Sequence, residues 1–159
     1  METRIDFVKA APTGIHHVLA LSKYVHDCGL ENSLLQLVFM RASQLNGCAY
    51  CLDMHSKDAR AAGETEQRLY ALDAWRETPF YSDRERAALA WTEAVTNIQQ
   101  GHAPDDVYQE LHKFFTENEI VNLTLAIATI NVWNRLAIPF RAPAGSYQPA
   151  EPAAAAKGA

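Results

Sequence analysis

The sequence of 159 residues has no concentration of positive charge. Its 14 Lys and Arg residues are scattered singly, without a basic run or interleaved aromatics, and the formal net charge is −5. Nucleic-acid binding depends on clustered cations that neutralise phosphates, so we expect no nucleic-acid partner. The negative net charge also disfavours an anionic membrane surface, and we expect no membrane partner.

The sequence also lacks an uninterrupted apolar run of membrane-spanning length. The longest apolar stretch, residues 120–138, contains three asparagines and Arg135, which are costly in lipid. We therefore interpret it as a buried core or interface helix. Residues 1–9 have no apolar core of the length that a secretory signal needs, so we expect a cytoplasmic protein.

No segment shows the alternating, β-branched pattern and short hairpin turns that strands require. We therefore expect an all-α, single-domain bundle of about six to seven helices in residues 1–140. Residues 141–159 are rich in Pro, Ala and Gly and are expected to form a flexible tail. Apolar periodicity, Gly stop signals and two capping boxes place the helices near 12–29, 32–46, 48–63, 65–75, 82–100, 104–115 and 116–138.

Cysteine is scarce, and two of the three cysteines lie in one short motif, Cys48-Ala-Tyr-Cys51-Leu-Asp-Met-His55. Because each helical residue turns the chain by about 100°, Cys48, Cys51 and His55 share one face of a helix. In a reducing compartment a close Cys-x-x-Cys pair is more often catalytic or metal-binding than structural. Cys28 has no partner nearby in sequence and is interpreted as a small buried apolar residue.

The position of the pair favours thiol redox chemistry. The break at Asn46-Gly47 places Cys48 and Cys51 at a helix start, where free N–H groups and the helix dipole stabilise a thiolate. If peroxide oxidises one sulfur to a sulfenic acid, the other can attack it and close a disulfide. His55 has the side chain for proton exchange near neutral pH.

A structural zinc site is the main rival chemistry for this motif. Two thiolates and one imidazole supply three ligands, but the sequence has no second Cys-x-x-Cys and no His-x-x-x-His to complete a closed tetrahedral site. We therefore expect no metal and no other cofactor. The five remaining histidines have no matching partner spacing and are expected at the surface.

Together these residues resemble the alkylhydroperoxidase D-like branch of the carboxymuconolactone decarboxylase family. The redox signature of that branch is Glu, eleven residues, then Cys-x-x-Cys-x-x-x-His, and residues 48–55 match its second half. The resemblance implies an all-helical homo-oligomer, a trimer or hexamer, with Cys51 as the peroxide-attacking sulfur, Cys48 as the resolving sulfur and His55 in a proton relay. It also implies a peroxide substrate and a dithiol reductant such as a lipoyl-bearing or thioredoxin-like protein.

The chain departs from this signature at Gln36, which stands twelve positions before Cys48 in place of the expected relay glutamate. An amide forms hydrogen bonds but has no titratable carboxylate to act as a base. Three explanations compete: the relay is crippled, Glu93 has taken over the role of the base, or the helix start and His55 suffice.

The predicted function is thus a thiol-dependent peroxidase or disulfide reductase, slowed by Gln36. Two alternatives stay open. One is the lyase activity of the family's decarboxylase branch, which does not use a cysteine pair. The other is a non-enzymatic oligomeric redox sensor, in which the disulfide changes assembly instead of turning over peroxide.

Overall fold

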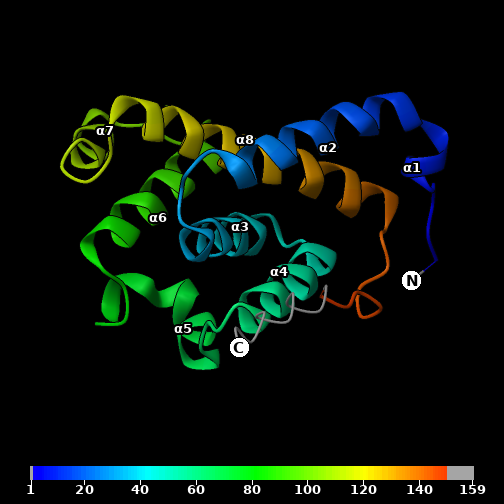
Figure 1. Cartoon of the computed structure of the whole chain (residues 1–159), viewed down its shortest axis with the longest axis horizontal. Helices are drawn as coiled ribbons and strands as arrows, with labels where there is room; N and C mark the ends of the chain where they lie inside the picture. Colours follow the sequence, from blue (N-terminus) through cyan, green and yellow to red (C-terminus); the bar gives the residue numbers. More distant parts are fainter. Residues whose placement is uncertain (1, 150–159) are drawn as a thin grey trace, which may run out of the picture.

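The computed structural model describes residues 2–149, which contain eight α-helices, one 3-10 helix and no β-strand (Figure 1). The all-α prediction is confirmed. In chain order the elements are α1 (Phe7–Ala10), α2 (Pro12–Asp27), α3 (Asn32–Asn46), α4 (Ala49–Ala61), α5 (Glu66–Tyr70), η1 (Ala71–Glu77), α6 (Asp83–Thr96), α7 (Asp105–Leu111) and α8 (Glu117–Phe140).

Helix α3 forms the centre of the bundle because it is apolar on nearly every side. It packs against α4, α6 and α8, and α2 packs in turn on α8. Figure 1 shows α3 enclosed between the α2–α8 pair and α4. Leu35, Leu37 and Val38 are fully buried, so side chains on several faces of α3 contribute to the core.

Helix α8 begins at the predicted capping box, in which Thr116 and Glu119 each satisfy a free backbone N–H. Among residues 2–149, α8 is the one helix long and apolar enough to cross a membrane by length and composition. Its Asn122, Asn131 and Asn134 side chains are buried against the rest of the protein. This burial agrees with the interpretation of residues 120–138 as a core helix.

Three helices differ from the predicted boundaries. The expected helix at 65–75 divides into α5 and η1, with Ala74 outside helical geometry (φ −106°, ψ 28°). Helix α6 stops at Thr96, and the chain then turns through Gly101, His102 and Ala103, all with positive φ. Helix α7 is likewise shorter than predicted. Residues 97–100 contain no Gly or Pro, so no stop signal marks the end of α6 before Gly101.

The short helix α1 was not predicted, because a four-residue turn has no periodicity to recognise. The carboxylate of Asp6 caps it by accepting a hydrogen bond from the Lys9 N–H at 3.1 Å. This turn carries Phe7 and Val8 to the wall of a cavity described below.

The first part of the predicted tail lies along α4. The Gly145 N–H donates to the Asp53 carboxylate at 3.0 Å, and the Tyr147 hydroxyl donates to Asp58 at 2.7 Å. Lys57 donates to the Tyr147 carbonyl at 2.9 Å. Residues 145–147 are therefore anchored to the outer face of α4, while residues 150–159 of the predicted tail lie outside the described residues.

Candidate functional site

A tight turn between α3 and α4 places the cysteine pair. Gly47 adopts a left-handed conformation (φ 70°), and its N–H and that of Cys48 bond to carbonyls in the last turn of α3. Glycine accepts this geometry without steric cost, which explains the break predicted at Asn46-Gly47. Cys48 then occupies the N-cap of α4, with its sulfur 3.4 Å from the Cys51 N–H.

Buried amides from α8 hold this turn in place. The Asn46 amide donates to the side-chain oxygens of Asn131 (3.0 Å) and Asn134 (2.8 Å), and Asn134 donates to the Ser43 hydroxyl (3.1 Å). Because Ser43, Asn131 and Asn134 are buried, a lost bond leaves a costly unpaired partner. The network therefore fixes the end of α3 from which Cys48 projects.

Cys48 and Cys51 form a disulfide across the first turn of α4, with their Cα atoms 5.4 Å apart. Each residue is only 1% exposed. The structure thus brings the two sulfurs of the motif together at a helix N-terminus, where a thiolate is stabilised after reduction.

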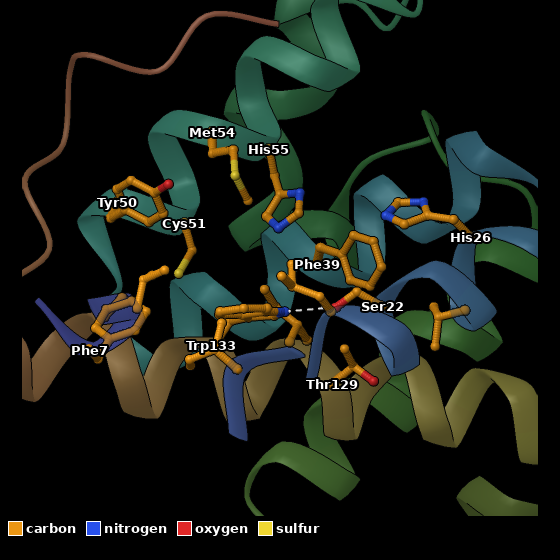
Figure 2. A pocket seen from close by; sticks show the side chains of 16 residues that line it. Phe7, Ser22, His26, Phe39, Tyr50, Cys51, Met54, His55, Thr129 and Trp133 are labelled. Carbon is orange, nitrogen blue, oxygen red and sulfur yellow. Dashed lines mark hydrogen bonds between the residues drawn. The ribbon is translucent and has the colours of Figure 1, made fainter. Parts of the chain in front are cut away.

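A pocket of about 370 Å³ opens beside the pair, bounded by side chains from α1, α2, α3, α4 and α8. Its walls are largely apolar and include the aromatic rings of Phe7, Phe39, Tyr50 and Trp133. Figure 2 shows Cys51 and His55 on this wall, with Trp133 across the cavity. Cys48 does not line the pocket. A small apolar molecule in the pocket would therefore meet the sulfur of Cys51.

His55 is buried one turn beyond Cys51, and its Nδ1 lies 3.1 Å from Oε1 of Gln36. The His55 ring also packs on Phe39, with the two centroids 4.9 Å apart. Burial, helped by the charge of His26, lowers the pKa of His55 from 6.5 to about 4. The imidazole is therefore neutral at pH 7 and can accept a proton.

Gln36 is placed by α3 so that it contacts His55, as a relay residue at this position would. Both residues are 6% exposed. The position twelve residues before Cys48 therefore belongs to the site geometrically, although its side chain is an amide.

Glu93 is not brought to the cysteine pair. Its carboxylate accepts hydrogen bonds from Arg41 (2.8 Å), Trp75 (2.8 Å) and Arg76 (2.6 Å), and Glu93 does not line the pocket. Burial raises the pKa of Glu93, but the bonds from Trp75 and Arg76 and the charge of Arg41 outweigh it, so the pKa lies below its usual value. The carboxylate is engaged in a structural ion cluster.

Several pocket residues were missed by the sequence analysis. Met54 was recognisable, since it stands three residues after Cys51 and next to His55 on the helix. Phe7 lies far from the cysteine motif in the sequence and carried no signal, and Trp133 was interpreted first as part of a buried interface, with a pocket role as the weaker alternative. His26 is exposed, as expected, but it also lines the pocket, with its ring 5.7 Å from that of Phe39.

Within residues 2–149, no three His, Cys, Asp or Glu side chains come together in a way that would hold a metal ion.

Fold and site define a helical protein whose Cys-x-x-Cys pair, closed as a disulfide, faces an apolar pocket beside a buried neutral histidine. The sequence profile of the carboxymuconolactone decarboxylase family matches residues 14–94. The chain belongs to this family, in its alkylhydroperoxidase D-like (AhpD-like) branch.

Relatives support this assignment. The uncharacterised protein YdfG of Bacillus subtilis is 41% identical over 138 residues, which cover 87% of this chain and 94% of YdfG. The solved structure of ATU0492 from Agrobacterium tumefaciens is 44% identical, with a TM-score of 0.89 over 92% of this chain and 100% of that one. ATU0492 is a protein of unknown function proposed to act in antioxidant defence as an AhpD.

A more distant structure shares the fold. The debrominase Bmp8 is 21% identical, with a TM-score of 0.79 over 87% of this chain and 75% of Bmp8. A cysteine-to-alanine variant of Bmp8 has been solved in complex with 2,3,4-tribromopyrrole.

Proposed function

We propose that the protein is a thiol-dependent peroxidase that reduces hydrogen peroxide or an organic hydroperoxide through Cys51 and Cys48. The observation that carries this proposal is the position of Cys51, which lines an apolar pocket while lying within disulfide reach of Cys48. The family and the antioxidant role proposed for ATU0492 support it.

The first half of the reaction consumes the peroxide. His55 takes the proton of the Cys51 thiol, and the thiolate attacks the outer oxygen of the hydroperoxide. As the S–O bond forms, the O–O bond breaks, and the proton from His55 passes to the leaving alkoxide to give the alcohol. Cys51 is left as a sulfenic acid.

The second half closes the disulfide. The Cys48 sulfur attacks the Cys51 sulfur, the S–O bond breaks, and the hydroxide leaves as water with the Cys48 proton. A dithiol reductant then attacks the disulfide at Cys51, because this sulfur lines the pocket and Cys48 does not. The pair returns to two thiols and the reductant becomes a disulfide.

We further propose the setting that this cycle needs. The reductant is a dithiol carrier, lipoyl-bearing or thioredoxin-like, whose sulfur reaches the pocket. The location is cytoplasmic, where such carriers keep thiols reduced. The assembly is a homo-oligomer, a trimer or hexamer, supported by exposed apolar side chains such as Val121 and Val132 on α8.

The test is to reduce the protein, add one equivalent of hydrogen peroxide or cumene hydroperoxide, and count free thiols. We expect two of the three thiols to be lost, with Cys28 retained; retention of all three would refute the peroxidase. Turnover with dihydrolipoamide or reduced thioredoxin distinguishes an enzyme from a redox sensor. A sensor would be oxidised once and change its assembly by size-exclusion chromatography.

A second candidate is thiol-dependent dehalogenation of a small aromatic compound. It is favoured by the aromatic walls around Cys51 and by the shared fold of Bmp8, a debrominase. In this reaction two thiols supply two electrons, a proton replaces the halogen, and a disulfide and halide ion are produced. Release of bromide from a bromopyrrole by the reduced protein, measured by ion chromatography, would identify it.

A further inference from the structure

Gln36 separates two cavities of different character. Through His55 it adjoins the apolar pocket, and on its other side it lines a cleft of about 300 Å³ with Ser33, Glu64, Arg68 and Glu85. From this arrangement we propose that Gln36 is a positioning residue that holds His55 in the Nδ1–H tautomer and leaves the Nε2 lone pair free for the pocket.

The direction of the hydrogen bond follows from the orientation of the amide. Oε1 of Gln36 lies 3.1 Å from Nδ1 of His55, and a carbonyl oxygen accepts only, so this contact is a hydrogen bond when Nδ1 carries the hydrogen. The opposite tautomer would place two lone pairs against each other across this distance. It is compatible with Gln36 only if the amide rotates.

Gln36 also lines the second cleft. Within residues 2–149 the Gln36 Nε2 makes no hydrogen bond to another residue, and no side-chain nitrogen there is both buried and unpartnered, so the NH₂ group keeps some exposed surface. The cleft holds the carboxylates of Glu64 and Glu85, with Arg68 paired to both. Rotation of the amide would remove the acceptor that faces Nδ1 of His55 in this structure.

The tautomer decides which ring nitrogen of His55 accepts a proton in the proposed peroxidase cycle. This part of the inference rests on that function. With Nδ1–H held by Gln36, His55 accepts the Cys51 thiol proton at Nε2 and returns the same proton to the leaving alkoxide. The proton taken from Cys51 is then the one that the alkoxide receives, so this step needs no carboxylate. Of the three explanations for a glutamine at position 36, this proton transfer favours the third, in which the helix start and His55 suffice for the reaction.

Few other groups can change the charge near His55. The titratable side chains that face the pocket are His26 from α2 and Tyr50 and Cys51 from α4. The pocket residues from α3 and α8 contribute none. The hydrogen bond that Nδ1–H donates to Oε1 of Gln36 is therefore the contact that distinguishes the two nitrogens of the ring.

The experiment is nitrogen NMR of the full chain with ¹⁵N-labelled histidine rings, in the reduced and disulfide forms at pH 7. The His55 signals are assigned from their loss in His55→Gln, and exposed His102 serves as an internal reference. We expect a pyrrole-type shift at Nδ1 and a pyridine-type shift at Nε2 of His55. An Nε2–H pattern, or a mixture like that of His102, would overturn the proposal.

Two variants separate positioning from packing. Gln36→Met keeps the length of the side chain without an acceptor and should give a mixed tautomer; an unchanged Nδ1–H pattern in this variant would contradict the proposal. Gln36→Glu retains the acceptor and adds a charge, so Nδ1–H should persist while the pKa of His55 rises by about 1–3 pH units. If the pKa of His55 does not rise in Gln36→Glu, the side chains of residues 36 and 55 are not in contact in solution. These measurements need no peroxide, so their outcome is independent of the peroxidase test.

Discussion

Nδ1 of His55 and Oε1 of Gln36 lie 3.1 Å apart in the buried wall between two cavities. The contact has the geometry of a carboxylate–imidazole relay but lacks the carboxylate charge. An amide orients the ring but adds no negative charge to stabilise its cation, and burial is the main influence on the pKa of His55. His55 is therefore a weak base that lies in the same pocket wall as Cys51.

The rate of peroxide reduction should follow the strength of that base. Gln36→Glu should accelerate oxidation of the reduced protein, because a carboxylate stabilises the imidazolium that forms as Cys51 loses its proton. General-base effects of about 10²–10⁴ set the upper range. Stopped-flow tryptophan fluorescence with excess hydrogen peroxide measures the rate.

The Gln36→Met variant is the matched control for this comparison. It should be slower than the wild type, because the ring is then no longer held in one tautomer. If Gln36→Glu and the wild type react at the same rate, position 36 does not limit the peroxide step.

The two cysteines should not be equivalent. Cys48→Ser leaves the pocket sulfur intact, so peroxide should convert Cys51 to a sulfenic acid that dimedone captures and mass spectrometry locates. Cys51→Ser should abolish this reaction, since Cys48 does not line the pocket. Labelling of Cys48 in the Cys51→Ser variant at the wild-type rate would reverse the assigned roles.

Folding stability should depend on the protonation of His55. Its pKa is about 4 when folded and 6.5 unfolded, so the unfolded chain binds the proton more tightly. Stability from this group is complete above about pH 6.5 and is lost as the pH falls towards 4, by about 3 kcal/mol in total. Urea unfolding between pH 7 and 4.5 measures the effect.

A variant without the titrating ring isolates this contribution. His55→Asn should lose less stability than the wild type over the same pH interval, although it is less stable at pH 7. Equal slopes for the two proteins would show that His55 is not the group responsible.

Glu93→Gln should affect stability and not chemistry. The substitution removes the charge that pairs with Arg41 and Arg76, and Arg41 is buried, so we expect a loss of about 1–3 kcal/mol in the free energy of unfolding. The peroxide rate of the folded variant should equal that of the wild type. A large fall in that rate would restore Glu93 as the base.

The apolar pocket should matter for bulky substrates only. Trp133→Leu removes much of the wall opposite Cys51 and should raise the KM for cumene hydroperoxide, because burial of apolar surface contributes about 25 cal/mol per Å². Hydrogen peroxide does not fill the pocket and should react as before. Parallel changes for both peroxides would indicate a general disturbance of the site.

The sequence predicted much of the fold because its signals are local. Apolar periodicity, Gly47 and the Ser82 and Thr116 capping boxes mark helix starts and stops through contacts within a few residues, and both boxes form as predicted. The missed features, α1 and the division between α5 and η1, depend on single turns that carry little periodic signal.

The sequence by itself determined that Cys48, Cys51 and His55 share a helix face, because helical spacing is a property of the backbone. Only the tertiary structure decided what faces them, since Phe7 and Trp133 reach the pocket from opposite ends of the chain. It also placed Gln36 on His55 and Glu93 among arginines, two outcomes that one sequence could not separate. Side-chain partners across helices are set by packing, which local spacing does not record.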